Sequence, residues 1–268
     1  MSKVVLSLTT IPSRLRDTGS TGIKSCIDSI TNQDCQDYEI HFNIPLVNKK
    51  TGEEYLIPEW LENYPCDHLK IFRPEEDYGS VTKIVPTLKR ETDPETIIIT
   101  CDDDLVYHHS MVSEQVKNQS EFEGCAVGYD GIMLRTPIFN DQRDYFCTSM
   151  RIKGEVKALQ QYKSVSFRRK YFEDDFFTNF IDKSWADDII ISAYMGLRGI
   201  GRMVTYHDSD EKFSTLDECM SRGGVTTFPV LRHTNHETIE GCNLWRDEQV
   251  SDDEHGILWA LIDKEIAE

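Results

Sequence analysis

The chain has 268 residues, 39% of them hydrophobic and 10% aromatic, which is enough for one large α/β domain with a substantial core. Its formal net charge of -18 argues against general binding to a nucleic-acid backbone and against adhesion to anionic membranes. The eight cysteines are scattered without a Cys-x-x-Cys pair, and no apolar run approaches the length of a membrane span. An apolar strand begins within a few residues of the start, so we expect no signal peptide, no membrane insertion and a cytoplasmic protein.

In the first 124 residues, apolar strand patterns alternate with helical patterns. This alternation is typical of βαβ units and a largely parallel sheet. A polar insertion at residues 46–66 separates the second strand from the third. Apolar residues at helical spacing predict helices at residues 23–30, 81–88 and 109–118. Continuous or alternating apolar residues predict strands at residues 4–9, 38–44, 69–72 and 96–101.

After Gly124 the predicted elements become shorter. A clear helix opens at Asp187 and ends at Gly199, and a last helix is expected at residues 253–266. There is no internal repeat and no obvious linker, so we expect one domain over residues 1–268. Strand-like segments are predicted at residues 125–129, 132–135, 163–168 and 202–206.

Three consecutive carboxylates, Asp102, Asp103 and Asp104, follow the apolar strand at residues 96–101. Three like charges at the end of a buried strand are costly unless a positive group lies among them. Ligands of open α/β sheets bind at this end of the strands. A divalent cation that shares the carboxylates with phosphate oxygens would remove the repulsion. We therefore favour a metal–phosphate site over the alternative, an ordinary acidic turn.

The loop after the first strand, Thr9-Thr10-Ile11-Pro12-Ser13-Arg14, is polar and lies where α/β folds often bind a nucleotide. It contains neither a Gly-x-Gly-x-x-Gly pattern nor a Walker motif, which argues against dinucleotide and P-loop binding. A plain surface loop is the alternative interpretation.

Three segments, in this order and spacing, resemble a family of GT-A-type glycosyltransferases that depend on nucleotide sugars and carry an Asp-x-Asp motif, here Asp-Asp-Asp. The segments are Leu6-Ser7-Leu8-Thr9-Thr10-Ile11-Pro12-Ser13-Arg14-Leu15, Asp77-Tyr78-Gly79-Ser80-Val81-Thr82-Lys83 and Ile98-Ile99-Thr100-Cys101-Asp102-Asp103-Asp104. Ser80-Val81 departs from the Gly-Pro-Ala common in relatives. The resemblance implies an α/β, GT-A (nucleotide-diphospho-sugar transferase) fold. This is a single Rossmann-like domain with a mostly parallel central sheet, a nucleotide-sugar-binding half at 1–124 and an acceptor-binding half at 125–268.

The resemblance also implies a nucleotide-sugar donor, UDP by default, and a divalent cation, Mn²⁺ or Mg²⁺. Asp104 would be the main metal ligand and would bridge to the diphosphate. Asp102 would contact the ribose or the metal, and Asp103 has no single assigned role. For Lys83, an exposed helical lysine is the alternative. Residues expected to border the donor are Thr9, Thr10, Pro12 and Arg14 near the nucleoside, Asp77 near the nucleobase and Lys83 in the donor region.

An inverting transferase needs a base that takes the proton of the acceptor hydroxyl. Asp187 and Asp188 precede an amphipathic helix and resemble the acidic pair that supplies this base in many GT-A enzymes. We favour Asp188, with Asp187 as the second choice. Alternatively, both residues stabilise the positive end of the helix, or the acidic segment 173–175 supplies the base.

Late histidines often complete the metal site in GT-A enzymes, which makes His233 and His236 candidate ligands. Trp185 adjoins the proposed base and is the candidate for stacking on the acceptor sugar. For each of these residues a purely structural role is the alternative.

The expected activity is metal-dependent, inverting transfer of a sugar from a UDP-sugar to a hydroxyl of a glycan acceptor. A sugar-nucleotide pyrophosphorylase is less favoured because the loop at residues 9–14 lacks glycines. A non-enzymatic carbohydrate- or calcium-binding module would leave the strand followed by three aspartates unexplained. We make no prediction of the sugar, the linkage or the oligomeric state.

Overall fold

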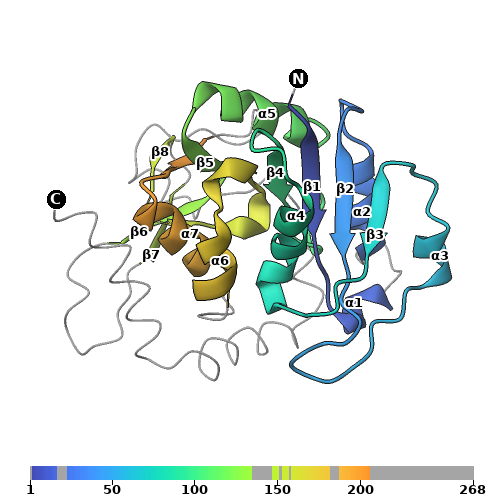
Figure 1. Ribbon diagram of the computed structural model, residues 1–268. Helices are drawn as coiled ribbons and strands as arrows, with labels where there is room; N and C mark the ends of the chain where they lie inside the picture. The colour runs from blue at the N-terminus through green and yellow to red at the C-terminus, as the bar shows by residue number, and fades with distance from the viewer. Residues whose placement is uncertain are drawn as a thin grey trace.

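The computed structural model describes residues 2–16, 23–134, 147–150, 153–156, 158–181 and 187–205. Within them the chain forms one eight-stranded sheet and one three-stranded sheet (Figure 1). In spatial order the larger sheet contains β3 (Leu69–Phe72), β2 (Glu39–Asn43), β1 (Val4–Leu8), β4 (Ile97–Thr100), β10 (Val165–Arg168), β5 (Cys125–Gly128), β11 (Gly201–Val204) and β8 (Gly154–Glu155). The smaller sheet contains β7 (Cys147–Met150), β6 (Gly131–Leu134) and β9 (Ala158–Leu159).

The larger sheet is mostly parallel, as the sequence predicts. The pairs β1–β2, β2–β3, β1–β4 and β5–β11 are all parallel. Strands β1 and β4 are buried along their whole length, which explains why they read as continuous apolar runs. The sequence pattern did not predict the placement of β10, which lies antiparallel between β4 and β5.

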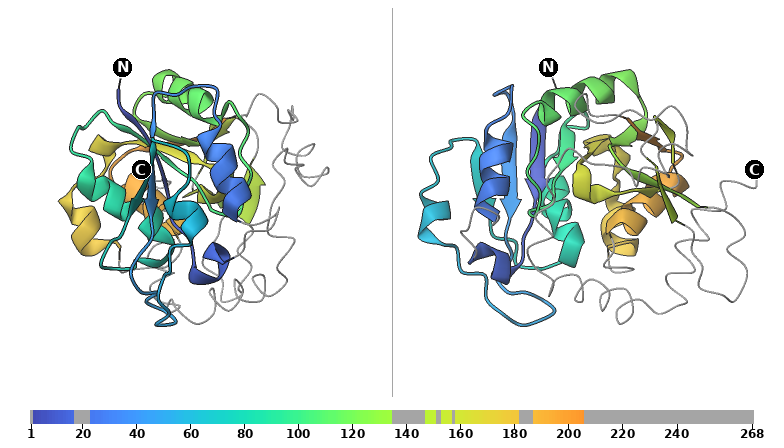
Figure 2. Two further views of the ribbon diagram at one scale, coloured as in Figure 1. Left: turned by 90° about the vertical axis from the view of Figure 1, so that its right-hand side faces the viewer. Right: turned by 180° about the vertical axis from the view of Figure 1, so that it is seen from behind.

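Helices cover both faces of this sheet (Figures 1 and 2). One core cluster joins α2 and α5 to β1, β2 and β4, and a second joins α4, α6 and α7 to the opposite face. The helical segments are α1 (Pro12–Leu15), α2 (Ile23–Thr31), α3 (Glu59–Glu62), η1 (Gly79–Lys83), α4 (Val85–Arg90), α5 (Met111–Glu121), η2 (Gln161–Lys163), η3 (Arg169–Tyr171), α6 (Asp174–Asn179) and α7 (Asp187–Leu197).

Two helical predictions need correction. The loop expected at residues 9–14 contains the short helix α1, which begins at Pro12, a residue suited to the first turn because it lacks an N–H. The single helix expected at residues 81–88 is the 3₁₀ helix η1 followed by α4, and the two meet at Ile84. The last expected helix, at residues 253–266, lies outside the described residues. Among the described helices, none has the length and apolar character needed to cross a membrane.

The topology brings the polar ends of several elements to one edge of the sheet. Because β1 and β4 are parallel neighbours, the loops that follow them start side by side. The amino end of α7 reaches the same region, since Asp187 at its start contacts Lys83 at the end of η1. This is the edge at which open α/β sheets bind ligands.

Candidate active site

Two groups of carboxylates predicted from the sequence meet through one lysine. The ammonium of Lys83 makes an ion pair with Oδ1 of Asp102, which follows β4. It makes a second one, 2.5 Å long, with Oδ2 of Asp187 at the start of α7. The fold therefore joins the aspartate triplet to the acidic pair, although the two lie far apart in the sequence.

Lys83 is only 4% exposed, so its interpretation as a solvated helical residue is wrong. Burial alone would lower the pKa of its ammonium, but the charges of Asp102 and Asp187 outweigh this effect and raise the pKa above its ordinary value. Lys83 thus remains positively charged at neutral pH and stabilises the two carboxylates that it contacts.

Arg14 binds the other two members of the triplet. From α1 its guanidinium makes an ion pair with Asp103 and a second with Oδ2 of Asp104 at 3.1 Å. The hydroxyl of Thr10 also donates to Asp103. Burial raises the pKa of Asp103 and the charge of Asp104 adds to this effect, whereas Arg14 opposes it. The loop after β1 therefore contacts the triplet directly, as expected for two parts of one site.

Tyr107, which the sequence analysis missed, holds the main chain of the triplet. Its hydroxyl accepts a hydrogen bond from the N–H of Asp102 at 2.7 Å and donates to the carbonyl of Tyr162 in η2 at 3.0 Å. In the same turn, the N–H of Gln161 donates to Oδ1 of Asp188 at 2.7 Å. Turn η2 thus connects the triplet, through Tyr107, with the acidic pair, through Asp188. No periodicity in the sequence distinguishes this tyrosine from a core residue.

Asp188 has the chemical environment of a proton acceptor. Burial raises the pKa of its carboxyl to about 7, and the charge of the neighbouring Asp187 contributes to the shift. The hydrogen bond from the N–H of Gln161 acts in the opposite direction and keeps the carboxylate partly stabilised. A carboxyl with a pKa near the working pH suits general base catalysis.

The other predicted donor residues have identifiable local roles. Thr9 donates to the carbonyl of Asn43 at 2.7 Å, and Pro12 is buried in the first turn of α1. Asp77 accepts hydrogen bonds from the N–H of Lys49 at 3.0 Å and of Gly79 at 2.9 Å, so it connects the insertion after β2 to η1. Trp185, His233 and His236 lie outside the described residues.

The rival acidic segment at residues 173–175 is engaged elsewhere. Glu173 makes an ion pair with Arg198, and Asp175 accepts a hydrogen bond from Tyr194 at 2.7 Å. These contacts link α6 to α7 and involve none of the triplet residues.

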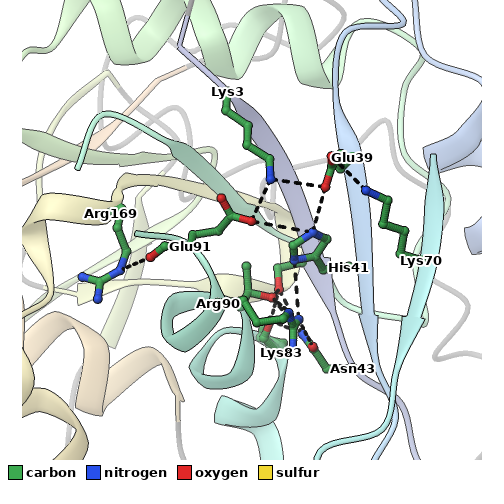
Figure 3. A network of polar contacts seen from close by, with 11 residues as sticks. Lys3, Glu39, His41, Asn43, Lys70, Lys83, Arg90, Glu91 and Arg169 are labelled. Carbon is green, nitrogen blue, oxygen red and sulfur yellow. Dashed lines mark hydrogen bonds and ion pairs between the residues drawn. The ribbon is translucent and has the colours of Figure 1, made fainter. Parts of the chain in front are cut away.

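Among the described residues, one group brings three potential metal ligands within 4.8 Å of one another: Glu39, His41 and Glu91. It lies near the amino end of β2 and does not include the aspartate triplet. The ammonium of Lys3 lies between its carboxylates, 3.3 Å from Glu39 and 2.9 Å from Glu91 (Figure 3). Lys3 thus pairs with this group as Lys83 and Arg14 pair with the triplet.

Solved structures with a similar arrangement place this geometry in a known fold. S. aureus TarS 1–349 in complex with UDP-GlcNAc matches with a TM-score of 0.50 and 13% sequence identity over 81% of this chain and 61% of that one. The chain has the GT-A fold.

Two further solved structures are similar to this chain. Mannosyltransferase PcManGT from Pyrobaculum calidifontis, in complex with GDP-Man and Mn²⁺, has 15% identity and a TM-score of 0.49 over 97% of this chain and 69% of that one. The 4-diphosphocytidyl-2C-methyl-D-erythritol synthase from Anaerococcus prevotii DSM 20548 has 15% identity and a TM-score of 0.48 over 82% of this chain and 94% of that one. No protein-family model and no curated protein sequence matches this sequence.

Proposed function

We propose that this protein is a metal-dependent, inverting glycosyltransferase that moves a sugar from a UDP-sugar to a hydroxyl of a glycan acceptor. The observation that carries the proposal is the position of Lys83, which contacts both Asp102 of the triplet and Asp187 of the acidic pair. A transferase needs a donor diphosphate site next to a proton acceptor, and Lys83 joins elements suited to these two tasks.

In this proposal residues 1–124 hold the donor and residues 125–268 hold the acceptor. The loop after β1 borders the nucleoside, and its Arg14 holds Asp103 and Asp104 in place through two ion pairs. Asp77 orders the insertion after β2 through its contact with Lys49. This contact lies next to the proposed position of the nucleobase. Trp185 is assigned to the acceptor sugar.

The donor atoms at the triplet fit a hard divalent cation. Mn²⁺ and Mg²⁺ prefer carboxylate oxygens, and Asp102 and Asp104 present such oxygens at the end of β4. We assign Asp104 as the main ligand and Asp102 as a further one, with His233 and His236 as additional candidates. When bound, the cation neutralises the charge that develops on the departing nucleotide diphosphate.

The chain's own side chains supply the remaining chemistry. Asp188 takes the proton of the acceptor hydroxyl as the new bond to the sugar forms and the bond from the sugar to the diphosphate breaks. The ammonium of Lys83 lies between the two carboxylate groups and provides positive charge on the donor side. Asp187 is engaged by this ammonium, which favours Asp188 over Asp187 as the base.

Thermal unfolding with UDP or GDP, each with and without Mn²⁺, tests the proposal. Ligand that binds only the folded state raises the melting temperature by mass action. We expect a nucleotide diphosphate to raise it strongly only when Mn²⁺ is present, and we expect Asp104→Ala to abolish the shift. The matched control is Asp174→Ala, which removes an exposed aspartate on α6.

Two results would contradict the proposal. A shift with Mn²⁺ alone that nucleotide does not increase would favour a metal-binding module. A larger shift with nucleoside triphosphate than with nucleoside diphosphate would favour a sugar-nucleotide pyrophosphorylase. An assay of UDP release from UDP-sugars then separates catalysis from binding. We expect Asp188→Asn to bind UDP but to release none from UDP-sugars.

A further inference from the structure

A group of polar side chains lies buried beneath η1 and α4, on the face of the sheet opposite α2. Ser7 interrupts the apolar strand β1, and Asn43 is the last residue of β2, in which polar and apolar residues alternate. Thr87 faces them from α4, and all three side chains are 0% exposed. Burying polar groups is costly unless each is hydrogen-bonded, so their partners indicate what they are for.

Two of these side chains contact the main-chain carbonyl of Lys83, and the third, Thr87, contacts both of them. The hydroxyl of Ser7 donates to this carbonyl and lies 2.6 Å from Oγ1 of Thr87. The amide nitrogen of Asn43 lies 3.4 Å from the same carbonyl and donates to Oγ1 of Thr87 at 3.0 Å. Lys83 is the last residue of η1, just before α4 begins, so side chains from two strands fix the junction between the two helices.

The orientation of the Asn43 amide is also fixed. A guanidinium nitrogen of Arg90 donates to Oδ1 of Asn43 at 2.6 Å. Because arginine can only donate hydrogen bonds, it must face the oxygen of the amide, and the NH₂ group must point toward Ser7 and Lys83. Arg90 in turn rests on the ring of Phe72, 3.6 Å from its centroid. Figure 3 shows Asn43 beside Arg90 and Lys83.

Lys83 is therefore held at both ends. Its carbonyl is bound by Ser7 and Asn43, and its ammonium is bound by Asp102 and Asp187. We propose that Ser7, Asn43 and Thr87 are positioning residues that set the main chain of Lys83 so that its ammonium reaches both carboxylates. The effect on sugar transfer rests on the proposed function, whereas the effect on the geometry of Lys83 does not.

The first test observes Lys83 itself. Lysine ammonium groups that are buried and ion-paired exchange protons slowly and give ¹H–¹⁵N signals, and Lys83→Met assigns the signal of Lys83. We expect Ser7→Ala and Thr87→Val to shift or broaden this signal, and Thr87→Ser, which keeps the hydroxyl, to restore it. Thr87→Val preserves the shape of the side chain, so it remains informative if Ser7→Ala fails to fold.

Ser166→Ala is the matched control, because it removes an equally buried hydroxyl from β10 that contacts Gln115 and the carbonyl of Val127. It should leave the Lys83 signal unchanged. A Lys83 signal that is unchanged in both Ser7→Ala and Thr87→Val, or that shifts equally in Ser166→Ala, would overturn the proposal.

The second test measures the consequence for catalysis in a double-mutant cycle. Misplacing a catalytic-site group by a fraction of an ångström costs about tenfold in rate, so we expect kcat of UDP-sugar turnover to fall about tenfold in Ser7→Ala. In the Lys83→Met background the same change should cause no further loss, because Ser7 acts through Lys83. Equal losses in both backgrounds would show that Ser7 acts only on overall stability and would overturn the positioning role.

The two tests separate this inference from the proposed function. If the wild-type protein turns over no nucleotide sugar, the proposed function fails, and the ammonium signal of Lys83 still decides whether Ser7 and Thr87 position it. If turnover is found but the Lys83 signal is unchanged in Ser7→Ala and Thr87→Val, the positioning role is wrong and the proposed function stands.

Discussion

At the scale of single residues, one hydroxyl group joins the parts of the proposed site. The hydroxyl of Tyr107 accepts from the N–H of Asp102 and donates to the carbonyl of Tyr162 in η2. The ring itself is buried in the core beneath α2 and α5. Removing the hydroxyl would leave the shape of the core unchanged but would take a hydrogen-bond partner from the N–H of Asp102 and from the carbonyl of Tyr162.

Tyr107→Phe is therefore expected to lower the free energy of unfolding by about 1–3 kcal/mol, the usual cost of leaving one buried polar group unsatisfied. It should also weaken binding of Mn²⁺ with UDP, because Asp102 loses a main-chain anchor. Tyr38→Phe is the control, since that hydroxyl donates to the carbonyl of Ile30 at 2.7 Å, within the helix-packed core. Urea unfolding and binding titrations measure both effects, and an equal loss of binding in the two variants would contradict the anchoring role.

Asp188 makes a prediction about pH. Because burial raises the pKa of its carboxyl to about 7 from an ordinary value of 3.8, the group is protonated in the folded protein below that pH. Only the ionised form can accept a proton, so kcat/KM, which reports ionisations of the free enzyme, should rise with pH through about 7 and then level off. A pH–rate profile that stays flat across this window would rule out Asp188 as the base.

The same shift has a consequence for stability. Between the ordinary pKa and the raised one, the folded state holds a proton that the unfolded state releases, so the free energy of unfolding falls as pH rises from about 4 to 7. Asp188→Asn should reduce this slope, which urea unfolding at several pH values measures.

At the scale of elements, the local sequence predicted those parts of the fold that depend on local periodicity. The apolar run of β4 and the helix that opens at Asp187 are present in the structure. The triplet could be singled out as a candidate site because its charges follow a buried strand. The direction of β10 could not, because its four residues have the pattern of any buried strand, and only pairing with β4 and β5 sets their orientation.

The contacts of the site were harder to predict than its residues. Lys83 and Asp187 were each expected at the site, but their contact depends on how α7 packs against the sheet. The polar group around the Lys83 carbonyl left a weak signal, since Ser7 interrupts the apolar strand β1, whereas Asn43 ends a strand in which polar and apolar residues alternate. Such interruptions within buried strands indicate a required hydrogen bond but do not identify its partner.

The chain leaves the larger sheet after β5 and enters the smaller sheet at Gly131, the first residue of β6, where the space admits no side chain. A Cβ atom added to Gly131 would lie 2.7 Å from a methyl carbon of Val156 and 2.8 Å from one of Val204. We expect Gly131→Ala to lower the free energy of unfolding by about 1–3 kcal/mol, because both valines are buried and stiff. Adding Val156→Ala should recover part of this loss in urea unfolding, and a destabilisation that this second change leaves untouched would contradict the steric explanation.

At the scale of the whole molecule, an acidic chain is proposed to bind a doubly charged anion. With a formal net charge of -18, the protein repels a nucleotide diphosphate at long range. Arg14 and Lys83 provide positive charge at the carboxylate cluster, and both have raised pKa values: burial opposes the shift, but the neighbouring aspartates outweigh it. These two side chains offset part of the negative charge of the carboxylates with which they form ion pairs.

The most direct measurement of the central claim is binding of Mn²⁺, followed by the electron paramagnetic resonance signal of the free ion, with and without UDP. Wild-type protein and Asp174→Asn should bind Mn²⁺ more tightly when UDP is present, and Asp104→Asn should lose this gain. If Asp104→Asn binds Mn²⁺ and UDP as the wild-type protein does, the aspartate triplet does not hold a cation for a diphosphate, and the proposed function is wrong.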